Sequence, residues 1–146
     1  MATIVNVFST LAEGQIAGVS TSVSNTATIA YNSTCLFSAL VNDVRGASYE
    51  PADISSVSYT ITDITDAETP EPVTGHSGVS LTVSDVFYSP EPRLYNGETI
   101  ITNFEFTPSR SSYEPFPEAG KTYRVRIDIE PSSGFCSPLI YDIITE

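Results

Sequence analysis

Apolar and polar residues alternate almost without interruption over residues 122–130. Tyr123, Val125, Ile127 and Ile129 occupy every second position, and the positions between them carry Thr, Arg, Asp or Glu. Because successive side chains of a strand point to opposite faces, this pattern predicts a β-strand with one face in a core and the other in water.

The same two-residue period returns along most of the chain, in short runs separated by Pro- and Gly-containing turns. The predicted strands cover residues 26–31, 34–41, 56–64, 79–84, 103–106, 122–130 and 138–144. The pattern contains no helix of useful length and no internal repeat. Seven or eight strands at this spacing predict an all-β fold, namely an antiparallel two-sheet β-sandwich of the immunoglobulin-like kind.

One local pattern supports the immunoglobulin-like interpretation. Tyr123 stands at the start of a predicted strand, directly after a tight corner at Ala119-Gly120. This arrangement resembles the tyrosine corner of immunoglobulin-like sandwiches. The chain departs from antibody domains at Val125, where those domains carry a Cys, and it contains no Trp.

The first 25 residues differ from the rest because no period of 2 or 3.6 is sustained in them. We therefore divide the chain into an extended N-terminal arm, residues 1–25, and a β-sandwich domain, residues 26–146. A tail or an extra edge strand is the alternative. Apolar side chains gain nothing by staying in water, so we expect the arm to dock on a neighbouring subunit. The residues expected to make this contact are Ile4, Val5, Val7, Phe8 and Leu11.

The charge of the chain restricts its partners. The 146 residues include 18 acidic and 6 basic ones, for a net charge of −12. Nucleic-acid binding requires Lys and Arg to displace counterions from phosphates, so this balance argues against nucleic acid and also against an anionic membrane surface. The negative charge can be explained by solubility, because like-charged copies of the chain repel one another. The more specific alternative is that the chain binds a basic partner surface.

The sequence predicts neither a membrane span nor a secretory signal. No stretch approaches the ~20 apolar residues that a spanning helix needs. The first basic residue is Arg45, so a basic n-region is missing, and we expect synthesis in a cytoplasm, with a removed leader as the alternative. Cys35 and Cys136 are expected to be free thiols, since the predicted topology places them toward opposite ends of the sandwich.

The usual marks of catalysis are weak, and we expect a non-enzymatic protein without cofactor or metal. His76 could recruit Ser77 or Ser80 with Asp85, but adjacent residues rarely meet in triad geometry and no Gly-x-Ser-x-Gly elbow is present. His76 is therefore interpreted as a plain loop histidine. Paired carboxylates for glycoside hydrolysis arise freely among 18 acids, and the cluster Asp63, Asp66 and Glu68 lacks the spacing of a calcium loop.

Exposed aromatic rings are the remaining candidate for recognition. Four aromatic residues fall in segments that read as loops: Tyr88, Tyr95, Tyr113 and Phe116. Such rings could bind a sugar, or they could contact another subunit or cap the ends of the sandwich.

Three stretches together resemble a family. They are ISSVSYTITD at residues 54–63, PVTGHSGVSLTVSDVF at 72–87 and FPEAGKTYRVRID at 116–128. They are similar to a loose group of small structural proteins of tailed bacteriophages and prophages, over about residues 34 to 144. The shared motifs are core and turn patterns, so no catalytic residue can be carried over.

The resemblance implies a non-enzymatic virion component. The function we expect is that of a capsid cement, or decoration, protein that binds the major capsid protein and self-associates as a dimer or trimer on the particle. A neck or tail component, or a carbohydrate-binding or adhesion module, is the alternative. The expected location is the virion, after synthesis in the host cytoplasm.

Overall fold

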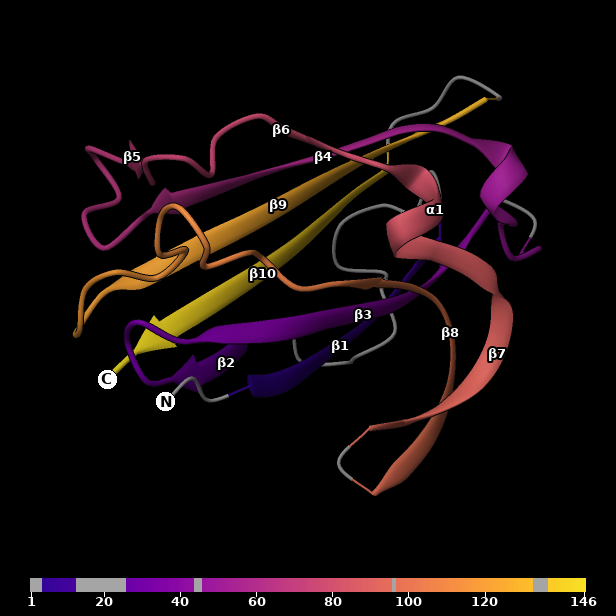
Figure 1. The fold of residues 1–146 in the computed structure, drawn as a ribbon, viewed down its shortest axis with the longest axis horizontal. Helices are drawn as coiled ribbons and strands as arrows, with labels where there is room; N and C mark the ends of the chain where they lie inside the picture. Colours follow the sequence, from indigo (N-terminus) through magenta and orange to yellow (C-terminus); the bar gives the residue numbers. More distant parts are fainter. Residues whose placement is uncertain (1–3, 13–25, 44–45, 96, 133–136) are drawn as a thin grey trace.

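A computed structural model describes residues 4–12, 26–43, 46–95, 97–132 and 137–146. Two β-sheets pack face to face (Figure 1). The first sheet has the order β1 (Ile4–Ala12), β3 (Thr34–Asn42), β8 (Glu98–Phe106) and β7 (Phe87–Tyr95). The second has the order β2 (Thr26–Ile29), β10 (Ser137–Thr145), β9 (Thr122–Pro131), β4 (Ile54–Asp63) and β5 (Glu71–Pro72), and β6 (Val79–Leu81) also pairs with β4. The predicted two-sheet β architecture is confirmed.

The alternating segments behave as their periodicity predicts. In β9 the side chains of Tyr123, Val125, Ile127 and Ile129 are buried, whereas Arg124 between them is exposed. Helix is confined, in the described part of the chain, to a 3-10 turn (Pro51–Asp53) and α1 (Val83–Val86). α1 falls where the sequence predicted the end of a strand, so the strand prediction for residues 79–84 is correct only over β6.

Strand direction differs from the prediction of a wholly antiparallel arrangement. β1 pairs with β3 in parallel, and β10 pairs with β2 in parallel. The other strand pairs in both sheets are antiparallel. Alternation reports which face of a strand is buried but carries no information on the direction of its neighbour, and this is why the prediction was wrong for these two pairs.

The N-terminal segment contributes a strand to the first sheet. β1 is hydrogen-bonded along β3, with Ile4 opposite Thr34 and Ala12 opposite Asn42. This is the edge-strand alternative of the sequence analysis, because β1 lies at one edge of the sheet. The side chains of Ile4, Val5, Val7, Phe8 and Leu11 and the structure of residues 13–25 lie outside the described part, so their docking role stays a prediction.

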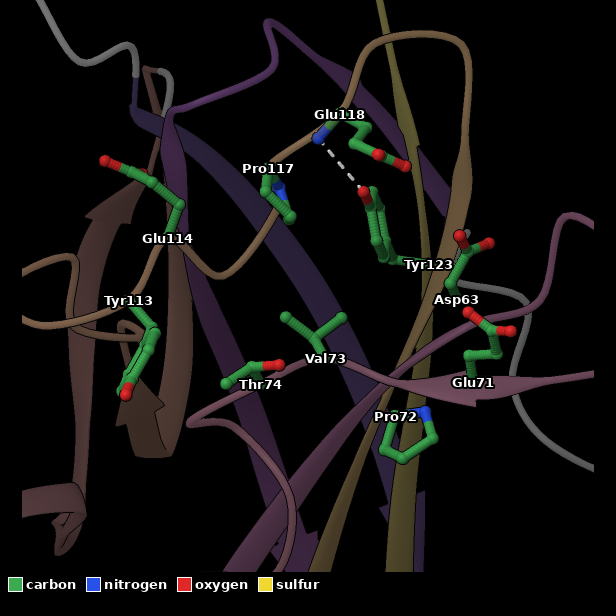
Figure 2. Close-up of a pocket in the computed structure, with 10 residues that line it drawn as sticks. All are labelled: Asp63, Glu71, Pro72, Val73, Thr74, Tyr113, Glu114, Pro117, Glu118 and Tyr123. Carbon is green, nitrogen blue, oxygen red and sulfur yellow. Dashed lines mark hydrogen bonds between the residues drawn. The ribbon is translucent and has the colours of Figure 1, made fainter.

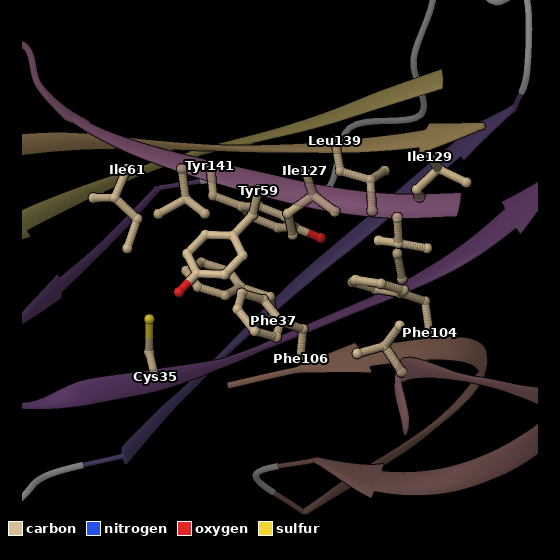
Figure 3. Packing of buried hydrophobic residues seen from close by; sticks show 14 of the residues in the cluster. Cys35, Phe37, Tyr59, Ile61, Phe104, Phe106, Ile127, Ile129, Leu139 and Tyr141 are labelled. Carbon is tan, nitrogen blue, oxygen red and sulfur yellow. The ribbon is translucent and has the colours of Figure 1, made fainter. Parts of the chain in front are cut away.

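The core forms between the inner faces of the two sheets (Figure 3). The ring of Phe37 on β3 lies 4.6 Å, centroid to centroid, from that of Tyr141 on β10, and Tyr59 on β4 lies 4.6 Å from Phe106 on β8. Each fully buried side chain of this kind contributes roughly 1.5–3 kcal/mol relative to an exposed one. These contacts join strands that are far apart in sequence and hold the two sheets together.

Two finer predictions can be compared with this core. The Tyr123 hydroxyl accepts a hydrogen bond of 3.1 Å from the amide of Glu118, five residues upstream, which is the contact a tyrosine corner makes. Cys35 is a buried free thiol, as expected. Cys136 lies outside the described residues.

Candidate functional site

The hairpin of β7 and β8 extends away from the sandwich (Figure 1). β3 pairs with β8 only from Phe104 to Phe106, whereas β7 pairs with β8 out to Tyr95 and Glu98. Beyond Phe104, therefore, β8 has β7 as its strand neighbour in the described structure. This projecting part, residues 91–95 and 97–102, is called the hairpin tip below.

Asn103 holds the base of the hairpin tip where β8 separates from β3. Its fully buried side chain accepts a hydrogen bond of 2.8 Å from the Val41 amide and donates bonds of 2.9 Å to the carbonyls of Val41 and Tyr49. The amide group thus takes the place of a neighbouring strand, since it satisfies both backbone groups of a β3 residue.

One face of the hairpin tip is apolar and open to solvent. The register places Pro92 opposite Ile101 and Leu94 opposite Thr99, so these side chains share a face. Leu94 is 71% exposed and Ile101 is 52% exposed. These four residues are called the apolar tip face.

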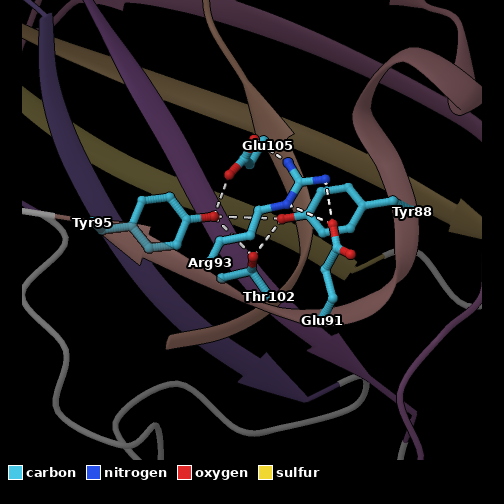
Figure 4. A network of polar contacts seen from close by, with 6 residues as sticks. All are labelled: Tyr88, Glu91, Arg93, Tyr95, Thr102 and Glu105. Atoms are coloured by element: carbon cyan, nitrogen blue, oxygen red, sulfur yellow. Dashed lines mark hydrogen bonds and ion pairs between the residues drawn. The ribbon is translucent and has the colours of Figure 1, made fainter. Parts of the chain in front are cut away.

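The opposite face carries a network of polar contacts (Figure 4). The Arg93 guanidinium lies 3.5 Å from the centre of the Tyr88 ring and makes ion pairs of 2.7 Å with Glu91 and 2.6 Å with Glu105. The Tyr95 hydroxyl donates to the Glu105 carboxylate. Thr102 bonds to the hydroxyls of both tyrosines. Contacts from both strands therefore stiffen the hairpin tip from behind its apolar face.

Two members of this network, Tyr95 and Arg93, have raised pKa values. Burial, together with the hydrogen bond to Glu105, raises the pKa of Tyr95, so its hydroxyl remains a donor. Partial burial lowers the pKa of Arg93, but the bonds to Glu91 and Glu105 and the neighbouring Tyr88 outweigh it, and the net pKa is raised.

Of the four aromatic residues predicted to lie in loops, the structure places two on a strand and buries a third within its loop. Tyr88 and Tyr95 lie on strand β7, where Tyr95 is buried and Tyr88 is half-buried. Phe116 lies in the core, with its ring edge-on to Tyr123. Prolines at positions 90 and 92 suggested a loop, but an edge strand such as β7 tolerates proline because its outer N–H groups need no ladder partner.

Tyr113 is the one of these four that is exposed, and it lines a second candidate site (Figure 2). The site is a pocket of about 390 Å³ with Val73 and Thr74 beside the ring. Four carboxylates also line it: Asp63, Glu71, Glu114 and Glu118. Lys121 stands within 3.9 Å of Asp63 and 3.7 Å of Glu118, so one cation partly offsets this acidic lining.

His76 is buried and contacts the backbone of Tyr113, whereas a plain loop histidine would be exposed. Its Nδ1 is 2.6 Å from the Tyr59 hydroxyl and its Nε2 is 2.8 Å from the Tyr113 carbonyl. An Nε2–H tautomer satisfies both contacts, since Tyr59 then donates to Nδ1 and Nε2 donates to the carbonyl. Both ring nitrogens are therefore occupied by groups other than Ser77, Ser80 and Asp85, the partners considered for a triad.

Gly75 completes the support of Tyr113. It has a positive φ of 81°, and a Cβ built at Gly75 would lie 2.3 Å from Cδ2 of Tyr113. Only glycine both adopts this backbone conformation readily and leaves room for the ring.

In the acidic segment considered as a calcium loop, the Asp66 carboxylate is hydrogen-bonded within a local turn. Asp66 accepts bonds from the Glu68 amide at 3.0 Å and the Thr69 hydroxyl at 2.8 Å, and these bonds lower the Asp66 pKa. Within the residues that the structure describes, no group of three or more His, Cys, Asp or Glu side chains is placed to hold a metal ion.

The sequence pattern did not predict the hairpin tip, although one signal for it is present. Asn96-Gly97 is the dipeptide most typical of a two-residue hairpin turn. The flanking runs lacked clean alternation, because Pro90 and Pro92 interrupt the first and Ile100-Ile101 are adjacent in the second. Leu94, Ile101 and Arg93 were therefore not considered.

Comparisons with protein-family models, curated proteins and solved structures found no match to this chain. None of the helices in the described ranges is both long and apolar enough to span a bilayer.

Proposed function

We propose that this protein is a non-enzymatic structural component of a tailed-bacteriophage virion, a capsid cement protein that binds the major capsid protein shell. The single observation that carries the proposal is the projecting hairpin tip, a stiffened element with an apolar face in solvent. Apolar side chains displayed on a rigid projection are typical of protein–protein contact. The resemblance of residues 54–63, 72–87 and 116–128 to phage structural proteins supports the same function.

The sandwich itself is proposed to be immunoglobulin-like. Strands β3, β8 and β7 are neighbours in one sheet, and β10, β9 and β4 are neighbours in the other. This order corresponds to the B-E-D and G-F-C neighbours of an immunoglobulin domain, and the tyrosine-corner contact stands at the start of β9, the F position. The parallel pairing of β1 with β3 departs from that scheme.

The mechanism that follows is stabilisation by mass action. A protein that binds the assembled shell and not the free subunit shifts the equilibrium toward the shell by an amount that grows with its concentration. We expect each copy to contact two or more capsid subunits and to self-associate as a dimer or trimer on the particle. Neither nucleic acid nor membrane has a part in this mechanism.

The test is an immunoblot for this protein across density-gradient fractions of particles from the source culture. We expect it to co-band with the particles at a near-stoichiometric ratio to the major capsid protein. A few copies per particle would instead place it in the neck or tail, and its absence from particles would overturn the virion proposal.

A carbohydrate-binding module is the second candidate, favoured by the exposed Tyr113 ring beside carboxylates that can accept hydrogen bonds from sugar hydroxyls. It predicts saturable binding on a glycan array that Tyr113→Ala abolishes and Tyr31→Ala, at an exposed tyrosine elsewhere, leaves intact. The cement proposal predicts that neither the unmodified chain nor these two variants bind glycans.

A further inference from the structure

We propose that the apolar tip face is the surface that binds the capsid, and that its partner is an apolar recess in the major capsid protein rimmed by Lys and Arg side chains. This inference rests on the proposed function and names the contact element and the chemistry of its partner.

The apolar part of the inference comes from exposure and shape. Leu94 and Ile101 are among the most exposed large apolar side chains in the described structure, and the register puts them on one face with Pro92. A flat partner surface would contact the tip poorly, whereas a recess would surround side chains that stand on a projecting hairpin.

The basic rim follows from the net negative charge of the hairpin as a whole. Residues 87–106 contain Glu91, Glu98 and Glu105 against the single cation Arg93, and Arg93 is already paired with Glu91 and Glu105. At the base of the hairpin Glu50 accepts a bond from Ser89, which adds another carboxylate. A partner of complementary charge must therefore supply cations.

Among the residues that the structure describes, the rest of the chain offers no unpaired cation for an acidic partner. The described lysine and arginine side chains all make ion pairs within the chain: Arg93, Arg110, Lys121, Arg124 and Arg126. A second copy of this chain is a poor occupant of the tip face, because its net charge of −12 would repel the acidic hairpin.

The hairpin tip is also held rigid on one side. The ion pair of Arg93 with Glu105 and the hydroxyl contact of Tyr95 with Thr102 bridge the two strands behind the apolar tip face. A surface that is already ordered loses little conformational entropy on binding.

The test uses particles produced without this protein, mixed with the full-length chain and pelleted by ultracentrifugation. The double variant Leu94→Ser/Ile101→Ser should bind the particles at least about tenfold more weakly than the unmodified chain. The control variant Ile140→Ser/Ile144→Ser removes two exposed isoleucines from the other sheet and should bind like the unmodified chain. Binding should also weaken as NaCl rises from about 0.05 to about 0.5 M, since a basic rim is screened by salt.

The outcomes separate the two proposals. If the unmodified chain fails to pellet with the particles, the proposed function is wrong. If it pellets and the Leu94→Ser/Ile101→Ser variant pellets equally well, the cement function stands and the tip-face inference is overturned. Binding by the unmodified chain that is insensitive to salt would overturn the basic rim, and this measurement needs no variant to fold.

Discussion

Asn103 shows how one side chain can replace a strand. Its amide satisfies the N–H and C=O of Val41 and the C=O of Tyr49 at the point where β8 turns away from β3. The Val41 carbonyl also accepts a bond from the Tyr49 amide, so removing the Asn103 side chain would take a partner from the Val41 N–H and the Tyr49 C=O. Each buried group left without a hydrogen bond costs about 1–3 kcal/mol.

Replacing this side chain by an apolar one of similar size should therefore be costly. We expect Asn103→Leu to lower the free energy of unfolding by about 3 kcal/mol or more, measured by urea denaturation. Thr99→Ala, at an exposed position of the same strand, should change it by less than about 0.5 kcal/mol. Equal stability of the two variants would show that Asn103 does not hold the base of the hairpin.

A second prediction at the residue scale concerns the reactivity of the buried Cys35 thiol. Burial raises the pKa of its thiol from the ordinary value of 9.0 to about 12. The thiolate is the reactive species, so in a Cys136→Ser background Cys35 should resist labelling by a disulfide reagent at pH 8 and react once the protein is unfolded. Rapid labelling of the folded protein would contradict the burial of this thiol.

The same raised pKa makes stability depend on pH in a known direction. The unfolded chain releases the Cys35 proton at lower pH than the folded chain does. This contribution to stability is complete below pH 9 and is lost as the pH rises from about 9 to about 12.

At the scale of elements, His76 joins three parts of the chain. Its ring lies between Tyr59 on β4 and the carbonyl of Tyr113, and its own backbone carbonyl accepts a bond of 2.8 Å from the Ile61 amide. The segment that carries Tyr113 is thereby attached to the second sheet through one imidazole.

Removing the two ring nitrogens should loosen this segment. We expect His76→Phe to lower the free energy of unfolding by about 2 kcal/mol, because the Tyr59 hydroxyl and the Tyr113 carbonyl lose their partners. Trypsin should also cut the folded variant faster after Arg110, which lies in the segment that His76 restrains. Ser77→Ala is the control at a neighbouring exposed position, and cleavage at the same rate in both variants would count against the attachment.

At the scale of the whole molecule, deleting the segment that contains β1 tests the division into an arm, residues 1–25, and a domain, residues 26–146. The described core cluster begins at Ile29, so residues 26–146 should keep a cooperative unfolding transition after residues 1–25 are deleted. We expect the truncated chain to melt at a lower temperature, because β3 loses the strand paired along it, and to attach more weakly to particles. Attachment equal to that of the full chain would rule out a docking role for residues 1–25, and a chain that no longer folds would make β1 part of the domain.

Of two rings predicted in the same loop, Tyr113 is exposed and Phe116 is buried, and the difference arises from the packing of the whole molecule. Tyr113 could be recognised as an exposed ring because the proline-containing loop around it is a local feature of the sequence. Phe116 lies three residues further along in the same loop and is buried against Tyr123, a contact that only the closing of the corner creates. The loop character of both residues was visible in the sequence, but the direction of each side chain was not.

The amino-acid sequence by itself determined the all-β character, the buried face of β9 and β4, and the corner at Tyr123. These features depend on residues that are close together in the chain, and a two-residue period reports them directly. The tertiary structure alone decided the parallel pairing of β1 with β3 and of β2 with β10, the burial of His76, the bonds of Asn103 to β3 and the projection of the hairpin tip. Each of these depends on groups far apart in sequence, whose approach is set by the packing of two sheets and leaves no periodic trace along the chain.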